Sequence, residues 1–292
     1  MEFVPVNGPR AKQLPGGSFD AIFLFCSVAE NLAAASSAIW VHTYSSGVDN
    51  CLAHPEMKDG RIIFSSSRGA NAAAVAEHAI ALMIAHAKEL HSYRDYQNRS
   101  LWNRDSFDEG NVWELGGKTM LILGLGSVGK QIAKRANALG MRVVATRNSS
   151  RKGPDYVEYV GLPDETLKLA TKADVVVNAL PLTNDTRGLI NNHFFRAMNT
   201  HAIIVSVGRG QTIVTDDLIA ALRAGDIGGA ALDVMDPEPI PANNPLWQMP
   251  NVTITPHVAG GGRESHQRVF QLLVENVRRY QSGEPLLNPV NY

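Results

Sequence analysis

The stretch that decides the fold is Met120-Leu-Ile-Leu-Gly124-Leu-Gly126-Ser-Val-Gly129, which leads into residues 130–139. Four apolar residues predict a short buried strand, and residues 130–139 have the pattern of a helix. The glycines between them have the spacing of a dinucleotide-binding turn. The first permits the tight turn, the second lets the backbone approach a pyrophosphate, and the third lets the helix pack closely on the strand. Ser127 and Val128 complete this turn at the helix N-terminus, which favours an anion.

Outside this stretch, short apolar runs alternate with helical patterns, which is typical of an α/β protein with parallel sheets. Strands are predicted at residues 21–26, 39–43, 61–65, 120–123, 142–145, 174–179, 202–207, 229–234 and 252–255. Residues 71–86 are apolar on nearly all sides, as expected of a helix buried between two domains. Residues 263–281 predict one amphipathic helix, and the polar, aromatic residues 92–113 predict a connection.

Length and composition limit the function classes. A chain of 292 residues predicts one large or two medium domains. Its net charge of -1 provides no field to attract nucleic acid or an anionic membrane. No apolar run approaches the roughly 18 residues of a membrane span, and the first residues lack the features of a signal peptide. With only Cys26 and Cys51, a disulfide framework is implausible, so we expect a reducing cytoplasm.

The residues after the second strand of the dinucleotide-binding unit indicate which cofactor is used. An NAD site has Asp or Glu about 20 residues after the glycines, where it accepts the ribose 2′-OH. This chain has Arg147 there, followed by Asn148 and Ser149. A guanidinium forms forked hydrogen bonds with a 2′-phosphate, and the amide and hydroxyl complete such a pocket. NADP(H) is therefore the predicted cofactor, with NAD(H) possible and a solvated basic loop as the competing explanation.

Three further segments place polar groups just beyond buried strands, where ligands bind in such sheets. They contribute Arg209, the acids Asp233 and Glu238, and His257. Each has an ordinary structural alternative: a surface arginine, a loop acid, or a histidine that bonds to the backbone. No spacing of the HExxH or CxxC type occurs, so we expect no metal site. His78 is expected to be a hydrogen-bonded histidine between domains.

Taken together, the motifs resemble the D-isomer-specific 2-hydroxyacid dehydrogenase family, from about Ser45 to the end of the chain. In the family's order they are Ser46-Gly-Val-Asp49, Val75-Ala-Glu-His-Ala79, the glycine turn, Leu180-Pro-Leu-Thr-Asn-Asp-Thr186, Gly208-Arg-Gly210, Ala231-Leu-Asp-Val234, Glu238-Pro239 and Thr255-Pro-His-Val-Ala-Gly260.

The resemblance implies two domains. Residues 89–264 would form a Rossmann-type doubly wound parallel sheet that binds the dinucleotide. Residues 1–88 and 265–292 would form a smaller, flavodoxin-like α/β substrate domain. That domain would be shortened at its N-terminus, because the family usually begins with a further strand and helix and Glu2-Phe-Val-Pro-Val resembles the family's second strand.

The resemblance also implies a division of labour. Arg209 would hold the substrate carboxylate and polarise the 2-oxo group, and His257 would be the general acid/base with Glu238 orienting it. Asp233 would face the nicotinamide carboxamide. Backbone N–H groups around Ser46 and Gly47 would bind the other edge of the carboxylate. The remaining cofactor contacts would be Leu180, Pro181, Thr186, Val207, Gly208 and Gly260.

The predicted function is an NADP(H)-dependent dehydrogenase that reduces small 2-oxo acids, such as glyoxylate or hydroxypyruvate, to D-2-hydroxy acids by hydride transfer. Formate dehydrogenases carry Gln where Glu238 stands, and phosphoglycerate oxidation is disfavoured because no regulatory domain follows Tyr292. A corepressor-like NAD-binding sensor and a catalytically impaired paralogue are the alternatives. The substrate cannot be named, because specificity would depend on side chains around Tyr44, Ser45 and Arg68.

The family usually dimerises through its nucleotide domains, so we expect a homodimer. Its expected location is the cytoplasm, as the cysteine count indicates. The aromatic residues that would contribute to such a surface, or instead to a buried core, are Tyr93, Tyr96, Trp102 and Trp113.

Overall fold

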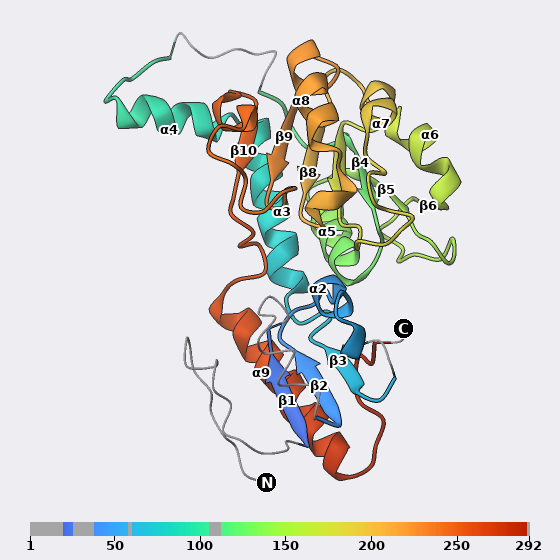
Figure 1. The fold of residues 1–292 in the computed structure, drawn as a ribbon. Helices are drawn as coiled ribbons and strands as arrows, with labels where there is room; N and C mark the ends of the chain where they lie inside the picture. The colour runs from blue at the N-terminus through green and yellow to red at the C-terminus, as the bar shows by residue number, and fades with distance from the viewer. Residues whose placement is uncertain (1–19, 26–37, 58–59, 105–111, 291–292) are drawn as a thin grey trace. The chain divides into compact units, whose positions relative to one another are not determined.

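A computed structural model describes residues 20–25, 38–57, 60–104 and 112–290. By its internal contacts the chain divides into two compact units, Met1–Asn71 with Gly262–Tyr292, and Ala72–Gly261 (Figure 1). Each unit contains one parallel sheet, as the α/β prediction requires.

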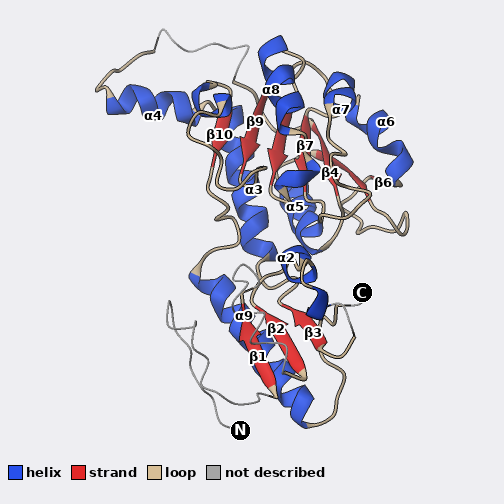
Figure 2. Cartoon of the chain, in the orientation of Figure 1, coloured by secondary structure: helices blue, strands red, loops and turns tan. Residues whose placement is uncertain are grey.

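The larger unit is built on a seven-stranded parallel sheet with the order β10-β9-β8-β7-β4-β5-β6 (Figure 2). The chain starts in the middle of the sheet at β4, runs outward to β6, and then returns to continue from β7 on the other side. This is the doubly wound order, whose reversal between the first and fourth strands is where ligands bind. The strands are β4 (Thr119–Leu123), β5 (Arg142–Thr146), β6 (Tyr159–Gly161), β7 (Val175–Asn178), β8 (Ile203–Ser206), β9 (Gly229–Leu232) and β10 (Val252–Ile254).

Both faces of this sheet are covered, which explains why its strands are apolar runs rather than alternating patterns. In β4, Met120 and Ile122 join one buried cluster, and Leu121 and Leu123 join the other. The first cluster includes α3 (Ala72–Ala87) and α5 (Ser127–Ala138); the second includes α7 (Asn192–Ala197) and α8 (Thr215–Ala224). The short helix α6 (Thr166–Ala170) and the 3₁₀ helices Pro163–Glu165, Gly210–Thr212 and Pro245–Gln248 complete the connections.

The sequence prediction was wrong for part of residues 92–113, because α4 (Leu90–Asn98) is helical. None of its residues is buried, so it lacks the apolar periodicity by which a helix is recognised. The three-residue strand β6 was also not predicted.

The smaller unit contains β1 (Ala21–Leu24), β2 (Trp40–Thr43) and β3 (Ile63–Ser66), which are parallel and lie in that order. The amphipathic helix α9 (Arg263–Gln281) is confirmed, and Trp40 stacks on its Tyr280 with ring centroids 5.2 Å apart. The remaining elements are the short helix α2 (Asp49–Leu52) and the 3₁₀ helix Pro55–Met57. The proposed first strand at residues 2–6 lies outside the described residues.

The two units differ from the predicted domains in the place of α3. The prediction assigned residues 72–88 to the substrate domain, whereas the contacts of α3 with α5, β8 and β9 place it in the larger unit. Alanines 76 and 79, both buried, allow α3 to pack closely there. The assignment of substrate and cofactor binding to the two units remains a prediction.

The expectation of reduced cysteines was wrong for Cys51, which is fully buried and disulfide-bonded. Cys26 lies outside the described residues. A count of two cysteines does not reveal whether the fold brings thiols within bonding distance, so the cytoplasmic location loses this support. In the described part of the chain, no helix is long and apolar enough to cross a membrane.

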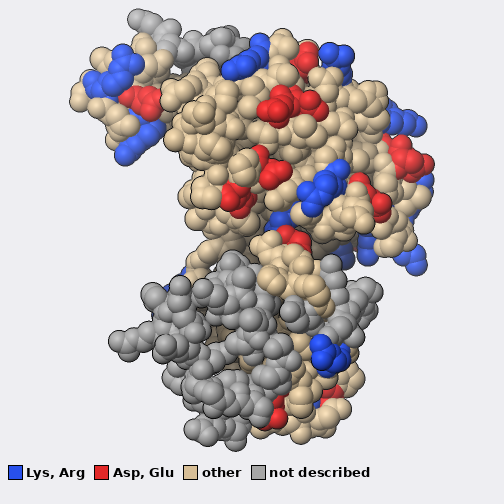
Figure 3. Space-filling view, in the orientation of Figure 1, with Lys and Arg blue, Asp and Glu red and all other residues tan. Residues whose placement is uncertain are grey.

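Charges of both signs are interspersed on the face of the larger unit seen in Figure 3.

Candidate active site

In the glycine turn between β4 and α5, two positions have no room for a side chain and therefore require glycine. Gly124 has φ +95°, and a Cβ there would lie 2.9 Å from the carbonyl oxygen of Ala179. A Cβ on Gly129 would lie 2.2 Å from the carbonyl oxygen of Gly124. A Cβ on Gly126, by contrast, would meet no described atom within 4 Å. Gly126 precedes α5 directly, so this open backbone at a helix N-terminus fits the pyrophosphate of a dinucleotide.

The basic loop after β5 contains two arginines in different environments. Arg151 is held by an ion pair with Glu165 and donates a hydrogen bond of 2.7 Å to the Tyr159 hydroxyl. Hydrogen bonds from Tyr159 and from the backbone of Leu162, and then the interaction with Arg151, lower the pKa of Glu165 to about 2. Glu165 thus neutralises Arg151.

Arg147, at the end of β5, donates instead to the carbonyl oxygen of Lys152 at 3.1 Å. No carboxylate among the described residues pairs with it, and Asn148 and Ser149 beside it are exposed. The half-buried Arg147 is therefore the better candidate for a 2′-phosphate.

The loop after β7 is stabilised by hydrogen bonds between its own side chains and backbone. The Thr186 hydroxyl donates to the carbonyl oxygen of Pro181 at 2.6 Å and accepts from the backbone N–H of Thr183 at 2.8 Å. A Cβ on Gly208 would lie 2.6 Å from the carbonyl oxygen of Leu180, so this loop and the turn after β8 are in close contact. Val207 is buried in the same turn.

Arg209 follows β8 at the carboxyl edge of the sheet and is half-buried. Its guanidinium donates to the carbonyl oxygen of Gly208 at 2.9 Å. The next residue, Gly210, lies so close to the segment after β9 that a Cβ would lie 1.8 Å from the Met235 carbonyl oxygen. The turn that bears Arg209 is therefore fixed against the segment that leads to Glu238.

A buried amide that the sequence analysis missed also fixes this turn. Asn178, at the end of β7, donates to Ser206 Oγ at 3.0 Å and to Thr212 Oγ1 at 2.8 Å. Thr212 in turn donates to the carbonyl oxygen of Arg209 at 2.6 Å. The available signal was the single polar residue that ends the run Val175-Val-Val-Asn178.

His257 and Glu238 form a direct pair. The imidazole Nδ1 and the carboxylate Oε2 are 2.7 Å apart, and Oε1 accepts from the backbone N–H of Met235 at 2.9 Å. Both side chains are partly exposed, at 48% and 38%. Since the carboxylate only accepts, Nδ1 carries a hydrogen and Nε2 is the nitrogen left to exchange a proton.

The pair shifts both pKa values in the directions that acid catalysis needs. The hydrogen bond to Glu238 raises the pKa of His257, although burial and the charge of Arg209 oppose it. Burial raises the pKa of Glu238, but the hydrogen bonds from His257 and Met235 outweigh it, and the net pKa is lowered. An ionised Glu238 therefore stabilises a protonated His257.

Asp233 lies at the end of β9 with its side chain only 1% exposed. Its carboxylate accepts from the hydroxyl of Thr255 at 2.6 Å and from the backbone N–H groups of Val258 and Ala259, each at 3.0 Å. His78 is hydrogen-bonded to Thr255 as predicted, but both residues belong to the larger unit, so the predicted place of His78 between two domains is wrong.

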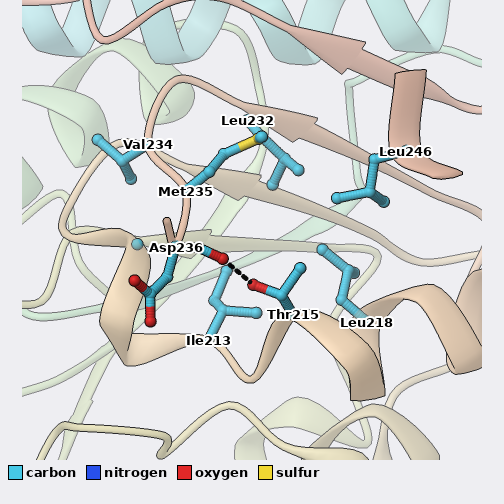
Figure 4. A pocket seen from close by; sticks show the side chains of 9 residues that line it. Ile213, Thr215, Leu218, Leu232, Val234, Met235, Asp236 and Leu246 are labelled. Carbon is cyan, nitrogen blue, oxygen red and sulfur yellow. Dashed lines mark hydrogen bonds between the residues drawn. The ribbon is translucent and has the colours of Figure 1, made fainter. Parts of the chain in front are cut away.

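A small, mostly apolar pocket lies behind Met235, and its lining includes the buried side chains of Leu218, Leu232 and Leu246 (Figure 4). Thr215 donates to the carbonyl oxygen of Asp236 at 2.7 Å at its edge. Arg209, Glu238 and His257 do not line it. This pocket is therefore a packing gap next to residues 234–236, which precede Glu238, and is not the candidate active site.

His257 and Glu238 are brought together as a pair, and the charge of Arg209 lowers the pKa of both groups. Ser46 and Gly47 follow β2 in the smaller unit, where the Ser46 hydroxyl donates to the carbonyl oxygen of Ser67 at 3.1 Å.

Residues 80–259 match the family model described as D-isomer specific 2-hydroxyacid dehydrogenase, NAD binding domain. The chain belongs to this family. The family match and the relatives below confirm the resemblance, the Rossmann-type unit and the class of enzyme, a nicotinamide-dependent oxidoreductase of small hydroxy or oxo acids.

Three similar proteins illustrate the range of this dehydrogenase family. The glyoxylate reductase of Pyrococcus furiosus is 33% identical over 251 residues, 84% of this chain and 73% of that protein. The D-3-phosphoglycerate dehydrogenase of Archaeoglobus fulgidus is 35% identical over 265 residues, 90% of this chain but only 49% of that protein. The solved NADPH-dependent glyoxylate/hydroxypyruvate reductase of Sinorhizobium meliloti, in complex with NADP and sulfate, has a TM-score of 0.83 and 25% identity, over 97% of this chain and 88% of that one.

Proposed function

We propose that this dehydrogenase is an NADP(H)-dependent reductase of small 2-oxo acids of the glyoxylate and hydroxypyruvate class. The observation that carries the proposal is the 2.7 Å pair of His257 with Glu238, on whose charges Arg209 also acts. This set provides a proton donor, a carboxylate that maintains its protonation, and a cation for an anionic substrate. The similarity to glyoxylate reductases supports the size of the substrate.

The chain's own residues have distinct tasks in this reaction. Arg209 binds the substrate carboxylate through its forked donors and polarises the 2-oxo group. His257 gives its Nε2 proton to the oxo oxygen during reduction and takes it back during oxidation. Glu238 holds the ring through Nδ1. Backbone N–H groups around Ser46 and Gly47 bind the carboxylate as well. When bound, the nicotinamide supplies the hydride that the 2-oxo carbon accepts.

The residues that would hold this cofactor lie along the carboxyl edge of the large sheet. The glycine turn, with Ser127 and Val128, binds the pyrophosphate, and Arg147 with Asn148 and Ser149 binds the 2′-phosphate. The remaining proposed contacts are Leu180, Pro181, Thr186, Val207, Gly208, Asp233 and Gly260.

The experiment that tests the proposal measures oxidation of NADPH and of NADH by purified protein with glyoxylate, hydroxypyruvate, pyruvate and bulkier 2-oxo acids. We expect turnover that favours NADPH and the small acids. Turnover that favours NADH contradicts the cofactor assignment alone. Cofactor binding without turnover of any acid contradicts the reductase proposal and favours a sensor or an impaired relative.

Replacing Arg147 with aspartate is expected to reverse the cofactor preference, lowering kcat/KM for NADPH by about tenfold or more. The new carboxylate repels a 2′-phosphate and accepts a hydrogen bond from a ribose 2′-OH instead. Steady-state kinetics with both cofactors measure the change. Arg151→Asp is a control in the same loop, since Arg151 is paired with Glu165. An unchanged preference in Arg147→Asp contradicts the assignment.

Replacing Glu238 with glutamine is expected to move the alkaline limb of the kcat/KM profile for reduction to lower pH. Reduction requires protonated His257, so its rate is present below the pKa of that group and is lost as pH rises through it. The hydrogen bond and charge of Glu238 raise this pKa, and glutamine removes the charge. A pH profile of the variant beside the wild type measures the shift. An unmoved limb means that Glu238 does not control the active acid.

We also propose that the protein forms a homodimer through the surface of α4 and the residues after it. Leu90, Leu101 and Trp102 expose 50%, 45% and 96% of their surface. Exposed large apolar residues such as these support a contact surface. Trp113 packs against the core of the larger unit instead. Sedimentation velocity of the wild type and of Trp102→Glu tests this: a wild-type monomer contradicts it.

A further inference from the structure

A partly buried series of hydrogen bonds leads from α3 to the loop that bears His257. His78 Nε2 lies 2.9 Å from Thr255 Oγ1 and 3.4 Å from Asp233 Oδ1. The Thr255 hydroxyl donates to Asp233 Oδ1 at 2.6 Å. All three residues belong to the larger unit.

The direction of each bond in this chain follows from the groups involved. The Asp233 carboxylate only accepts, and it uses the single hydroxyl hydrogen of Thr255. Thr255 Oγ1 is then left to accept from the imidazole, so Nε2 of His78 carries the hydrogen. The hydrogen bonds therefore run from His78 to Thr255 and from Thr255 to Asp233.

Asp233 connects these hydrogen bonds to the loop that bears His257. Its carboxylate accepts the backbone N–H groups of Val258 and Ala259, which directly follow His257. Its backbone carbonyl accepts the N–H of His257 itself at 2.9 Å. Asp233 therefore receives three consecutive backbone donors from one short segment.

The backbone of His257 needs such support because it lies in the left-handed region, with φ +53°. This conformation is unfavourable for a residue with a Cβ and persists only where its surroundings impose it. The hydrogen bonds to Asp233 impose it here. They set the direction in which the imidazole leaves the backbone toward Glu238.

We infer that Thr255 and His78 are positioning residues for the reaction, acting through Asp233 on the orientation of His257. The inference rests on the proposed role of His257 as the acid of the reaction. It gives His78 a function beyond that of a satisfied histidine, because His78 orients the hydroxyl that Asp233 depends on. The rate of the reaction falls steeply when the imidazole leaves its productive orientation, since small misplacements of a catalytic group are costly.

The test compares Thr255→Val, which keeps the shape but removes the hydroxyl, with Thr255→Ser, which keeps the hydroxyl. For Thr255→Val we expect kcat for the best 2-oxo acid to fall by about tenfold or more, with KM nearly unchanged. The pKa of the His257 imidazole, followed by NMR, is expected to fall as its bond to Glu238 loosens. Thr255→Ser is expected to retain wild-type values of both.

A second pair of variants tests the start of the chain in the same way. His78→Leu removes the donor to Thr255 and is expected to reproduce the Thr255→Val defect in kcat and in the pKa of His257. His78→Gln offers an amide N–H from a similar position and is expected to restore most of the wild-type behaviour.

The outcomes separate this inference from the proposed function. The NMR signal of His257 is identified by its loss in His257→Gln, so its pKa is measured without turnover. If the wild type turns over no 2-oxo acid, the proposed function fails, and the pKa comparison still decides whether Thr255 positions the ring. If Thr255→Val has a wild-type kcat and a wild-type His257 pKa, or lowers only the melting temperature, the inference is wrong.

Discussion

Replacing His257 with glutamine is expected to lower kcat for reduction of the best 2-oxo acid by about 10²–10⁴-fold, the usual contribution of a positioned general acid. The affinity for NADPH should change little, because the proposed phosphate contacts lie at the glycine turn and Arg147. Glutamine still donates hydrogen bonds, but its amide cannot give up a proton at neutral pH. Single-turnover kinetics and cofactor titration measure the two quantities separately.

The chain offers a matched control for this substitution. His201 Nε2 lies 2.9 Å from Asp174 Oδ1, a second histidine–carboxylate pair in the larger unit. Asp174 and His201 precede β7 and β8, so this pair lies at the amino edge of the sheet. His201→Gln should keep wild-type kcat. If His257→Gln retains comparable kcat, another group supplies the proton and the mechanism proposed for this site is wrong.

The doubly wound type of the large sheet was predictable because most of its strands are continuous apolar runs in the sequence. The apolar runs at β4, β5, β7, β8 and β9 stand out, since strands buried on both faces carry no polar alternation. The glycine turn then identified the first strand of the doubly wound order. Elements without such a signal were missed: β6 has three residues, and α4 buries none.

The catalytic candidates were predictable by type and place, but their supporting residues were not. Arg209, Glu238 and His257 each follow an apolar run that predicts a strand, and each belongs to a motif that resembles the family's. Nothing in the sequence indicates that Asn178 bonds to Ser206 and Thr212, or that Thr255 lies between His78 and Asp233. These contacts join residues up to 177 positions apart, and only the folded sheet brings them together.

The disulfide at Cys51 was missed for the same reason, because burial and proximity of thiols depend on the fold. Likewise, the sequence placed Arg147 at the 2′-phosphate position but did not show how Arg147 and Arg151 are paired. The structure separates them, since only Arg151 is paired with Glu165.

The glycine turn permits a second test with a large effect, because two of its glycines should fail in different ways when they are replaced by alanine. A Cβ on Gly129 would lie 2.2 Å from the carbonyl oxygen of Gly124, and because this neighbour is backbone there is little room to relax. Gly129→Ala is expected to lower the free energy of unfolding by about 1–3 kcal/mol or more, as overpacking does. Urea unfolding of the protein without cofactor measures this loss.

Gly126→Ala is the matched variant, and it should separate cofactor binding from stability. Gly126 has φ -85° and ψ -155°, which alanine adopts, and its Cβ would meet no described atom within 4 Å. The free energy of unfolding should therefore stay constant or rise by a few tenths of a kcal/mol, up to about 1. The Kd for NADPH should nevertheless rise at least about tenfold, or about 1.4 kcal/mol, because the methyl group stands where the pyrophosphate must approach. Tight NADPH binding by a stable Gly126→Ala protein would mean that the dinucleotide does not bind across this turn. The assignment of the glycine turn to cofactor binding would then be wrong.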